Sequence, residues 1–72
     1  MQLILNGIPR DIPGADTLQR VVDTVVLDNA AIKDSDRVIA ELNGKIIKRG
    51  NWSATMVQKD DSLELVSFVG GG

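Results

Sequence analysis

The sequence predicts an α+β domain in which one main helix packs on one face of a mixed sheet of about four to five strands. Three observations support this prediction. Two Asn-Gly pairs each lie between short apolar segments, as in tight β-hairpins. A central stretch places apolar residues at helical spacing. The segment near the carboxyl end alternates like a strand, and a single amphipathic helix can bury its apolar stripe only against a sheet.

The first hairpin is expected at the amino end. Residues 2–5 are mostly apolar and favour a strand, and Asn6 and Gly7 favour a tight turn because both tolerate positive φ. The chain should then return antiparallel along residues 8–12. Pro9 has no N–H to donate to a neighbouring strand, so this second strand is predicted at the edge of the sheet.

The main helix is expected to begin near Asp16. Asp16 could cap the first turn, and Gln19 could return a hydrogen bond to the cap residue. The β-branched residues that follow disfavour a helix, but the apolar periodicity outweighs that preference. A polar connection is predicted from residue 27 to residue 37. The predicted buried face of the helix consists of Leu18, Val21, Val22 and Val25.

A second hairpin is predicted after that connection. In residues 38–42, Val38, Ala40 and Leu42 share one face, and Ile39 and Glu41 share the other. Asn43 and Gly44 repeat the turn signal, and residues 45–48 form the returning strand. Residues 49–59 have no clear period and are expected to fold over the core as an irregular turn or short helix. The apolar residues expected to cover the core there are Trp52, Met56 and Val57.

The last strand is predicted from Leu63 to Val69, with Leu63 and Leu65 on the helix side. The opposite face of the sheet should carry Ile4, Ile39, Val66 and Phe68. A contiguous apolar patch next to the carboxyl end suggests a docking surface. The residues predicted to dock a partner are Ile39, Val66, Phe68 and Val69.

The amino-acid composition argues against several classes of function. With 72 residues, the chain has room for one small domain. It contains no cysteine, so it has no thiol chemistry of its own, and no histidine, which is the commonest general base and metal ligand. Both absences argue against an enzyme. A net charge of −2 with one Trp and one Phe argues against nucleic acid as a partner. The sequence shows no basic leader and no apolar stretch for a membrane, so a cytoplasmic location is expected.

The final glycines, Gly70, Gly71 and Gly72, are the predicted working part of the chain. We expect residues 1–69 to form the compact domain and residues 70–72 a flexible tail. Without side chains such a tail could thread a narrow channel, and a nucleophile could approach the terminal carboxyl carbon unobstructed. The alternative is a frayed end without function, since chain termini are usually disordered.

These features resemble the ubiquitin-like β-grasp sulfur carriers, most closely those of thiamine biosynthesis, which are related to the small subunit of molybdopterin synthase. The resemblance covers essentially the whole chain. It rests on the order and spacing of Met1-Gln2-Leu3 with Asn6-Gly7, of residues 42–47 followed by Arg49 and Trp52, and of residues 63–72. Lys48 departs from the proline frequent there, and Asp60-Asp61-Ser62 from the usual Asp-Gly-Asp.

The resemblance implies a fold and a chemistry. The first and last strands should lie side by side and parallel. A separate adenylating enzyme would use ATP and magnesium to activate the Gly72 carboxylate, which would become a thiocarboxylate, while Gly70 and Gly71 thread into the partner. Thiazole synthase would accept the sulfur, and a cysteine desulfurase or its relay would supply it. The chain itself would bind no cofactor and act as a protein co-substrate.

Other readings of the same tail remain open. A sulfur carrier for molybdopterin, cysteine or tRNA thiolation would share the chemistry and differ in the acceptor. A protein modifier would join Gly72 to lysines of its targets. A non-covalent binding module would use the face of Ile39, Val66 and Phe68, and Gly72 would then be dispensable.

Overall fold

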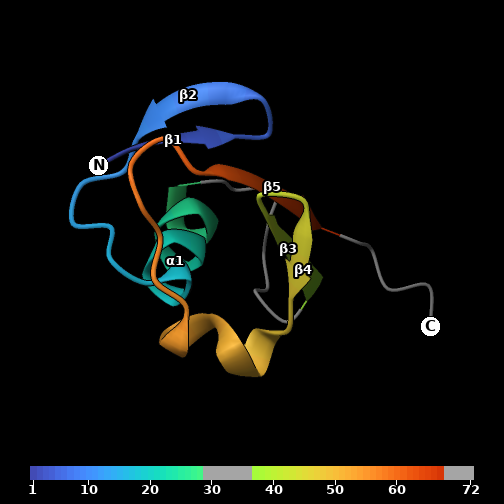
Figure 1. Ribbon diagram of the computed structural model, residues 1–72. Helices are drawn as coiled ribbons and strands as arrows, with labels where there is room; N and C mark the ends of the chain where they lie inside the picture. Colours follow the sequence, from blue (N-terminus) through green and yellow to red (C-terminus); the bar gives the residue numbers. More distant parts are fainter. Residues whose placement is uncertain (29–36, 68–72) are drawn as a thin grey trace.

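The computed structural model describes residues 1–28 and 37–67, and within them five strands form a single sheet. The strands are β1 (Gln2–Leu5), β2 (Ile8–Asp11), β3 (Val38–Leu42), β4 (Lys45–Ile47) and β5 (Ser62–Ser67). Their order across the sheet is β2-β1-β5-β3-β4. The sheet curves around one α-helix, which lies on one of its faces (Figure 1). The predicted α+β class is therefore confirmed.

Both predicted hairpins are present. β1 pairs antiparallel with β2, and β3 pairs antiparallel with β4. Asn6 and Asn43, the first residues of the two turns, both have a φ of 51°, and the glycines that follow also have positive φ. Asn and Gly are the residues that reach this left-handed conformation at least cost. The strand that contains Pro9 lies at one edge of the sheet, as its missing N–H predicts.

The last strand occupies the centre of the sheet. β5 runs parallel to β1, with Leu5 opposite Leu63, and antiparallel to β3, with Ala40 opposite Leu65. This confirms the adjacent parallel first and last strands that the family resemblance implies. A parallel pair needs a long crossover between its strands, and here the helix and the second hairpin lie within that crossover.

Helix α1 (Leu18–Asp28) buries the predicted stripe against the sheet. Val22 is fully buried, and Val25 is only 4% exposed. The helix extends to Asp28, so the polar connection does not begin at residue 27 as predicted. Leu27 continues the helical backbone but lies on the solvent side, with 85% of its surface exposed. The rest of the predicted connection, residues 29–36, lies outside the described residues.

The predicted cap of α1 is wrong by one residue. Thr17 Oγ1 accepts a hydrogen bond from the Arg20 backbone N–H at 3.2 Å, which makes Thr17 the capping residue. Gln19 donates its side-chain amide to Asp23 rather than to the cap. Asp16 instead accepts the backbone N–H of Thr17 and pairs with the Arg20 side chain.

The segment after β4 closes the end of the core. A 3-10 helix, η2 (Arg49–Ala54), passes beneath α1 (Figure 1) and buries Trp52. The Trp52 indole N–H donates to the Ile47 carbonyl at 2.9 Å, which satisfies its one polar group. No helix in residues 1–28 and 37–67 combines the length and the apolar character that a membrane crossing requires.

Residues 55–57 then run extended beside the start of α1. The Thr55 carbonyl accepts the Leu18 N–H, and the Val57 N–H donates to the Asp16 carbonyl. Because side chains alternate along an extended chain, Val57 points into the core and Met56 points out, with 61% of its surface exposed. Val57 covers the core as predicted, but the prediction that Met56 does so is wrong.

Candidate functional site

The candidate site is the carboxyl end of β5, from which the glycine tail continues. β3 remains paired with β5 as far as Ser67, which lies opposite Val38. Ser67 is the last described residue and stands three positions before Gly70, where the predicted tail begins. We call this end of β5, Val66 and Ser67, the base of the tail. The predicted site residues that lie outside the described residues are Phe68, Val69, Gly70, Gly71 and Gly72.

The two described residues predicted to dock a partner lie together. Ile39 on β3 is directly opposite Val66 on β5, so both side chains stand on the same face of the sheet. This is the face away from α1, because the intervening residues Ala40 and Leu65 are the ones buried. Ile39 is 43% exposed and Val66 is 55% exposed. The predicted placement is confirmed, and their role in docking remains a prediction.

Two carboxylates stand in the next row of this open face. Glu41 on β3 lies opposite Glu64 on β5, and Ile46 on β4 lies on the other side of Glu41. Like charges that face each other across a sheet are unfavourable for folding. The open face therefore combines apolar side chains near the base of the tail with a negative pair beside them.

A further residue at this site, Asn6, was not identified from the sequence as functional. Its backbone N–H donates to the Leu63 carbonyl at 2.8 Å, and its side-chain Oδ1 accepts the Leu65 N–H, also at 2.8 Å. β1 itself pairs with β5 only as far as Leu63. The Asn6 side chain thus holds β5 beyond the point where the neighbouring strand ends. The only sequence signal at this position is the Asn-Gly turn.

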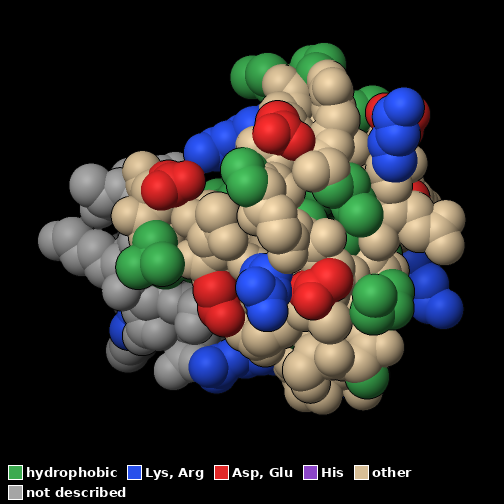
Figure 2. Space-filling view, turned by 90° about the vertical axis from the view of Figure 1, so that its left-hand side faces the viewer, with side chains coloured by type: hydrophobic (Ala, Val, Ile, Leu, Met, Phe, Trp, Pro, Cys, Tyr) green, Lys and Arg blue, Asp and Glu red, His purple; other side chains and the backbone are tan. Residues whose placement is uncertain are grey.

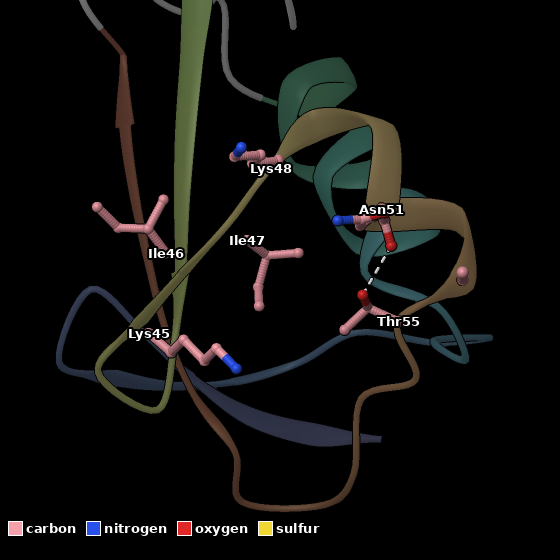
Figure 3. A pocket seen from close by; sticks show the side chains of 7 residues that line it. Lys45, Ile46, Ile47, Lys48, Asn51 and Thr55 are labelled. Atoms are coloured by element: carbon pink, nitrogen blue, oxygen red, sulfur yellow. Dashed lines mark hydrogen bonds between the residues drawn. The ribbon is translucent and has the colours of Figure 1, made fainter.

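A hollow of about 540 Å³ lies elsewhere, between β4 and η2. Lys45 and Ile47 point from β4 toward η2, whereas Ile46 points to the other side (Figure 3). Thr55 Oγ1 donates to the Asn51 carbonyl along the opposite wall (Figure 3). None of the residues predicted to carry function lines this hollow.

The view from the side of α1 and the amino terminus shows a mixed surface. Acidic and basic side chains are interspersed there among small apolar areas (Figure 2). In residues 1–28 and 37–67, no three His, Cys, Asp or Glu side chains form a group suited to holding a metal ion. Within the described residues, the base of the tail and the open face are therefore the best candidates for a functional site.

The chain is similar in sequence to known proteins. The model of the ThiS family matches residues 3–72. Two proteins called thiazole synthase, from Magnetococcus marinus and Paramagnetospirillum magneticum, are 33% and 29% identical over 72 residues. The match covers the whole of this chain but only 20% of each synthase.

Solved structures give a similar result. The crystal structure of a thiamine biosynthesis protein (ThiS) from Geobacter metallireducens is 30% identical, with a TM-score of 0.77 over 100% of both chains. An NMR structure of a thiamine biosynthesis protein from the same organism is 32% identical, with a TM-score of 0.73 over 100% of this chain and 88% of that one. The similarity therefore extends from the first strand to the carboxyl end.

Proposed function

Because the chain belongs to the ThiS family, we propose that it carries sulfur in thiamine biosynthesis as a thiocarboxylate on Gly72. The observation that carries this proposal is the family match from residue 3 to residue 72, which includes the final glycines. The full-length likeness to a thiamine biosynthesis protein supports it. The chain would be a co-substrate of other enzymes.

The proposed chemistry proceeds in two displacements. A carboxylate is a poor electrophile, so an oxygen of the Gly72 carboxylate first attacks the α-phosphate of ATP and pyrophosphate leaves. A sulfur nucleophile then attacks the acyl carbon, and AMP leaves with the former carboxylate oxygen. Magnesium would be held with ATP by the adenylating enzyme, where it neutralises phosphate charge. A closed partner site would protect the activated intermediate from hydrolysis.

The chain would supply the carrier surface for these reactions. The open face around Ile39 and Val66 would dock the adenylating enzyme, with Phe68 and Val69 extending the contact. Gly70 and Gly71 would thread the partner's channel, since they add no side-chain width. The sequence contains no cysteine, so a separate donor such as a cysteine desulfurase or its relay would supply the sulfur. An ATP-dependent activation is consistent with the cytoplasmic location that the sequence predicts.

Thiazole synthase is the proposed acceptor. Two relatives that bear this name contain, within a longer chain, a region similar to the whole of the present protein. Joining a carrier to its acceptor in one polypeptide raises their effective concentration without any new contact. We infer that the region formed by these 72 residues likewise delivers its sulfur to a thiazole synthase.

Intact mass spectrometry tests the proposal. The purified chain would be incubated with ATP, magnesium, a cognate adenylating enzyme and sulfide. We expect a mass increase equal to the exchange of one oxygen for sulfur, located at Gly72 by fragmentation. A variant lacking Gly71 and Gly72 should show no exchange, and Gly71→Ala should react slowly while keeping its melting temperature. An unmodified wild-type chain, with an enzyme active on another carrier, would refute the proposal.

The acceptor is tested separately with the thiocarboxylated chain. We expect it to bind thiazole synthase and to lose its sulfur there. Binding to a molybdopterin, cysteine or tRNA-thiolating acceptor instead would contradict the thiamine assignment. Isopeptide conjugates on a denaturing gel would indicate a protein modifier. Activity that survives removal of Gly71 and Gly72 would indicate a non-covalent module.

A further inference from the structure

Asn6 holds β5 near the base of the tail, on the side where strand pairing has already ended. β1 pairs with β5 at Ile4–Ser62 and Leu5–Leu63, and Asn6 and Gly7 then turn the chain. Figure 1 shows this turn as the connection between β1 and β2. On the opposite side β3 stays paired with β5 to Ser67. The last part of β5 therefore has a strand neighbour on one side, and on the other it has the Asn6 side chain.

The side-chain oxygen of Asn6 takes the place of a backbone carbonyl of a neighbouring strand. In a parallel pair, successive N–H and C=O groups of one strand bond alternately to the other. The Asn6 N–H bonds to the Leu63 carbonyl, and the next donor along β5, the Leu65 N–H, bonds to Asn6 Oδ1. The side chain thus adds one further hydrogen bond to the β1 side of β5. This bond spans 59 residues of sequence and stands three positions before Phe68.

We propose that Asn6 is a positioning residue that sets the direction in which the glycine tail leaves the sheet. This inference rests on the proposed function. A carboxylate must meet ATP in a narrow range of geometry, and a misplacement of about 1 Å can cost about a hundredfold in rate. Without Oδ1, the Leu65 N–H loses its acceptor, and the part of β5 beyond Leu63 is held from the β3 side alone. The end of β5, Val66 and Ser67, is then less firmly fixed in front of the tail.

Asn43 provides a matched control within the same molecule. It too begins an Asn-Gly turn, and its φ is identical to that of Asn6. Its Oδ1 accepts the Ser62 N–H at 2.9 Å, and its own N–H donates to the Ser62 carbonyl at 2.7 Å. Asn43 therefore ties down the beginning of β5, whereas Asn6 ties down the part that leads to the tail.

The experiment compares Asn6→Gly with Asn43→Gly. Glycine accepts the left-handed turn conformation, so each substitution removes the amide without backbone strain. With the adenylating enzyme, we expect Asn6→Gly to lower the kcat of adenylate formation about tenfold, with an unchanged affinity for the enzyme. Asn43→Gly should change kcat less than about twofold. Asn6→Asp, which retains the acceptor oxygen, should restore most of the activity.

A measurement without the enzyme separates this inference from the proposed function. In the NMR spectrum of the free chain, Asn6→Gly should speed hydrogen exchange at the Leu65 amide and alter the residual dipolar couplings of Val66 and Ser67, the described residues that lead to the tail. Asn43→Gly should leave those couplings unchanged. Unaltered couplings in Asn6→Gly, or an equal kcat loss in both variants, would overturn the inference. If the wild-type chain forms no adenylate, the proposed function fails, and the couplings still decide whether Asn6 fixes the base of the tail.

Discussion

The two faces of the sheet are made by the same strands and differ in their surroundings. On β5, Leu65 is 7% exposed and its neighbour Val66 is 55% exposed, and on β3, Ala40 is fully buried while Ile39 is 43% exposed. Successive side chains of a strand point to opposite sides, so one register assigns every residue to a face. Helix α1 and η2 cover one face, and within the described residues no element covers the other.

The covered face contributes mainly to stability, and the open face is available for binding a partner. Side chains on the covered face lose their contact with water when the chain folds, and they contribute most of the hydrophobic stabilisation. Apolar side chains on the open face gain little from folding and remain available to a partner. Substitutions on the covered face should therefore change the free energy of unfolding, and those on the open face should change docking.

The largest effect is expected at Trp52. Trp52→Ala empties a site that is 1% exposed and removes the donor to the Ile47 carbonyl, which should cost about 3 to 5 kcal/mol. Urea unfolding followed by circular dichroism measures the loss. Met56→Ala, in the extended segment just after η2, should cost less than about 0.5 kcal/mol because Met56 points outward. Similar losses in the two variants would contradict the side-chain placement.

The next largest effect on stability is expected from two adjacent residues of β5, Leu65 and Val66. Leu65→Ala should lower the free energy of unfolding by about 2 to 5 kcal/mol as a core truncation. Val66→Ala should lower it by less than about 1 kcal/mol, because Val66 faces solvent and loses only strand propensity. Urea unfolding measures both losses, and the denaturant midpoints of the two variants can be compared directly if their m-values are equal. A greater loss at Val66 would mean that the open face is covered in the folded chain.

Docking is the third comparison. Ile39→Ala and Val66→Ala should each weaken binding to the adenylating enzyme about tenfold, as truncation of a buried interface contact does. Ile8→Ala is the control, since Ile8 is 67% exposed but lies opposite Leu5 and so stands on the other side of the sheet. Titration calorimetry measures the affinities. Unchanged binding in both open-face variants would remove this face from the proposed interface.

The smallest effect is expected at the acidic pair. Glu41→Gln removes the like charge opposite Glu64 and should raise the free energy of unfolding by about 0.2 to 1 kcal/mol. Because salt screens exposed charges, this gain should shrink between low and high ionic strength. Urea unfolding at two salt concentrations measures it. A destabilised variant would show that Glu41 contributes a favourable contact.

Errors in the predictions from sequence arise where neighbouring residues could serve the same role. Asp16 and Thr17 are both suitable caps, and the choice between them depends on which backbone N–H groups the first turn leaves free. Trp52 and Met56 are both large and apolar, but only Trp52 points inward. Met56 is turned outward because residues 55–57 pair in an extended form with the start of α1.

The hairpins and the helix follow from signals between near neighbours in the sequence. Asn6 and Asn43 favour tight turns through their tolerance of positive φ, the apolar spacing of α1 requires a covered helix face, and the alternation of β5 separates a core side from an exposed side. Each of these signals acts over a few neighbouring residues. That is why the hairpins, the helix and the two faces could be predicted without a structure.

Side-chain contacts between distant parts of the chain become visible only in the folded structure. The fold gave Asn6 a second role, as the acceptor for the Leu65 N–H next to the base of the tail. A hydrogen bond between residues 59 positions apart leaves no local pattern, because neither partner needs a special neighbour in sequence. It forms because the pairing of β1 with β5 brings the first turn beside the last strand, and an amide oxygen there can satisfy a partly buried N–H.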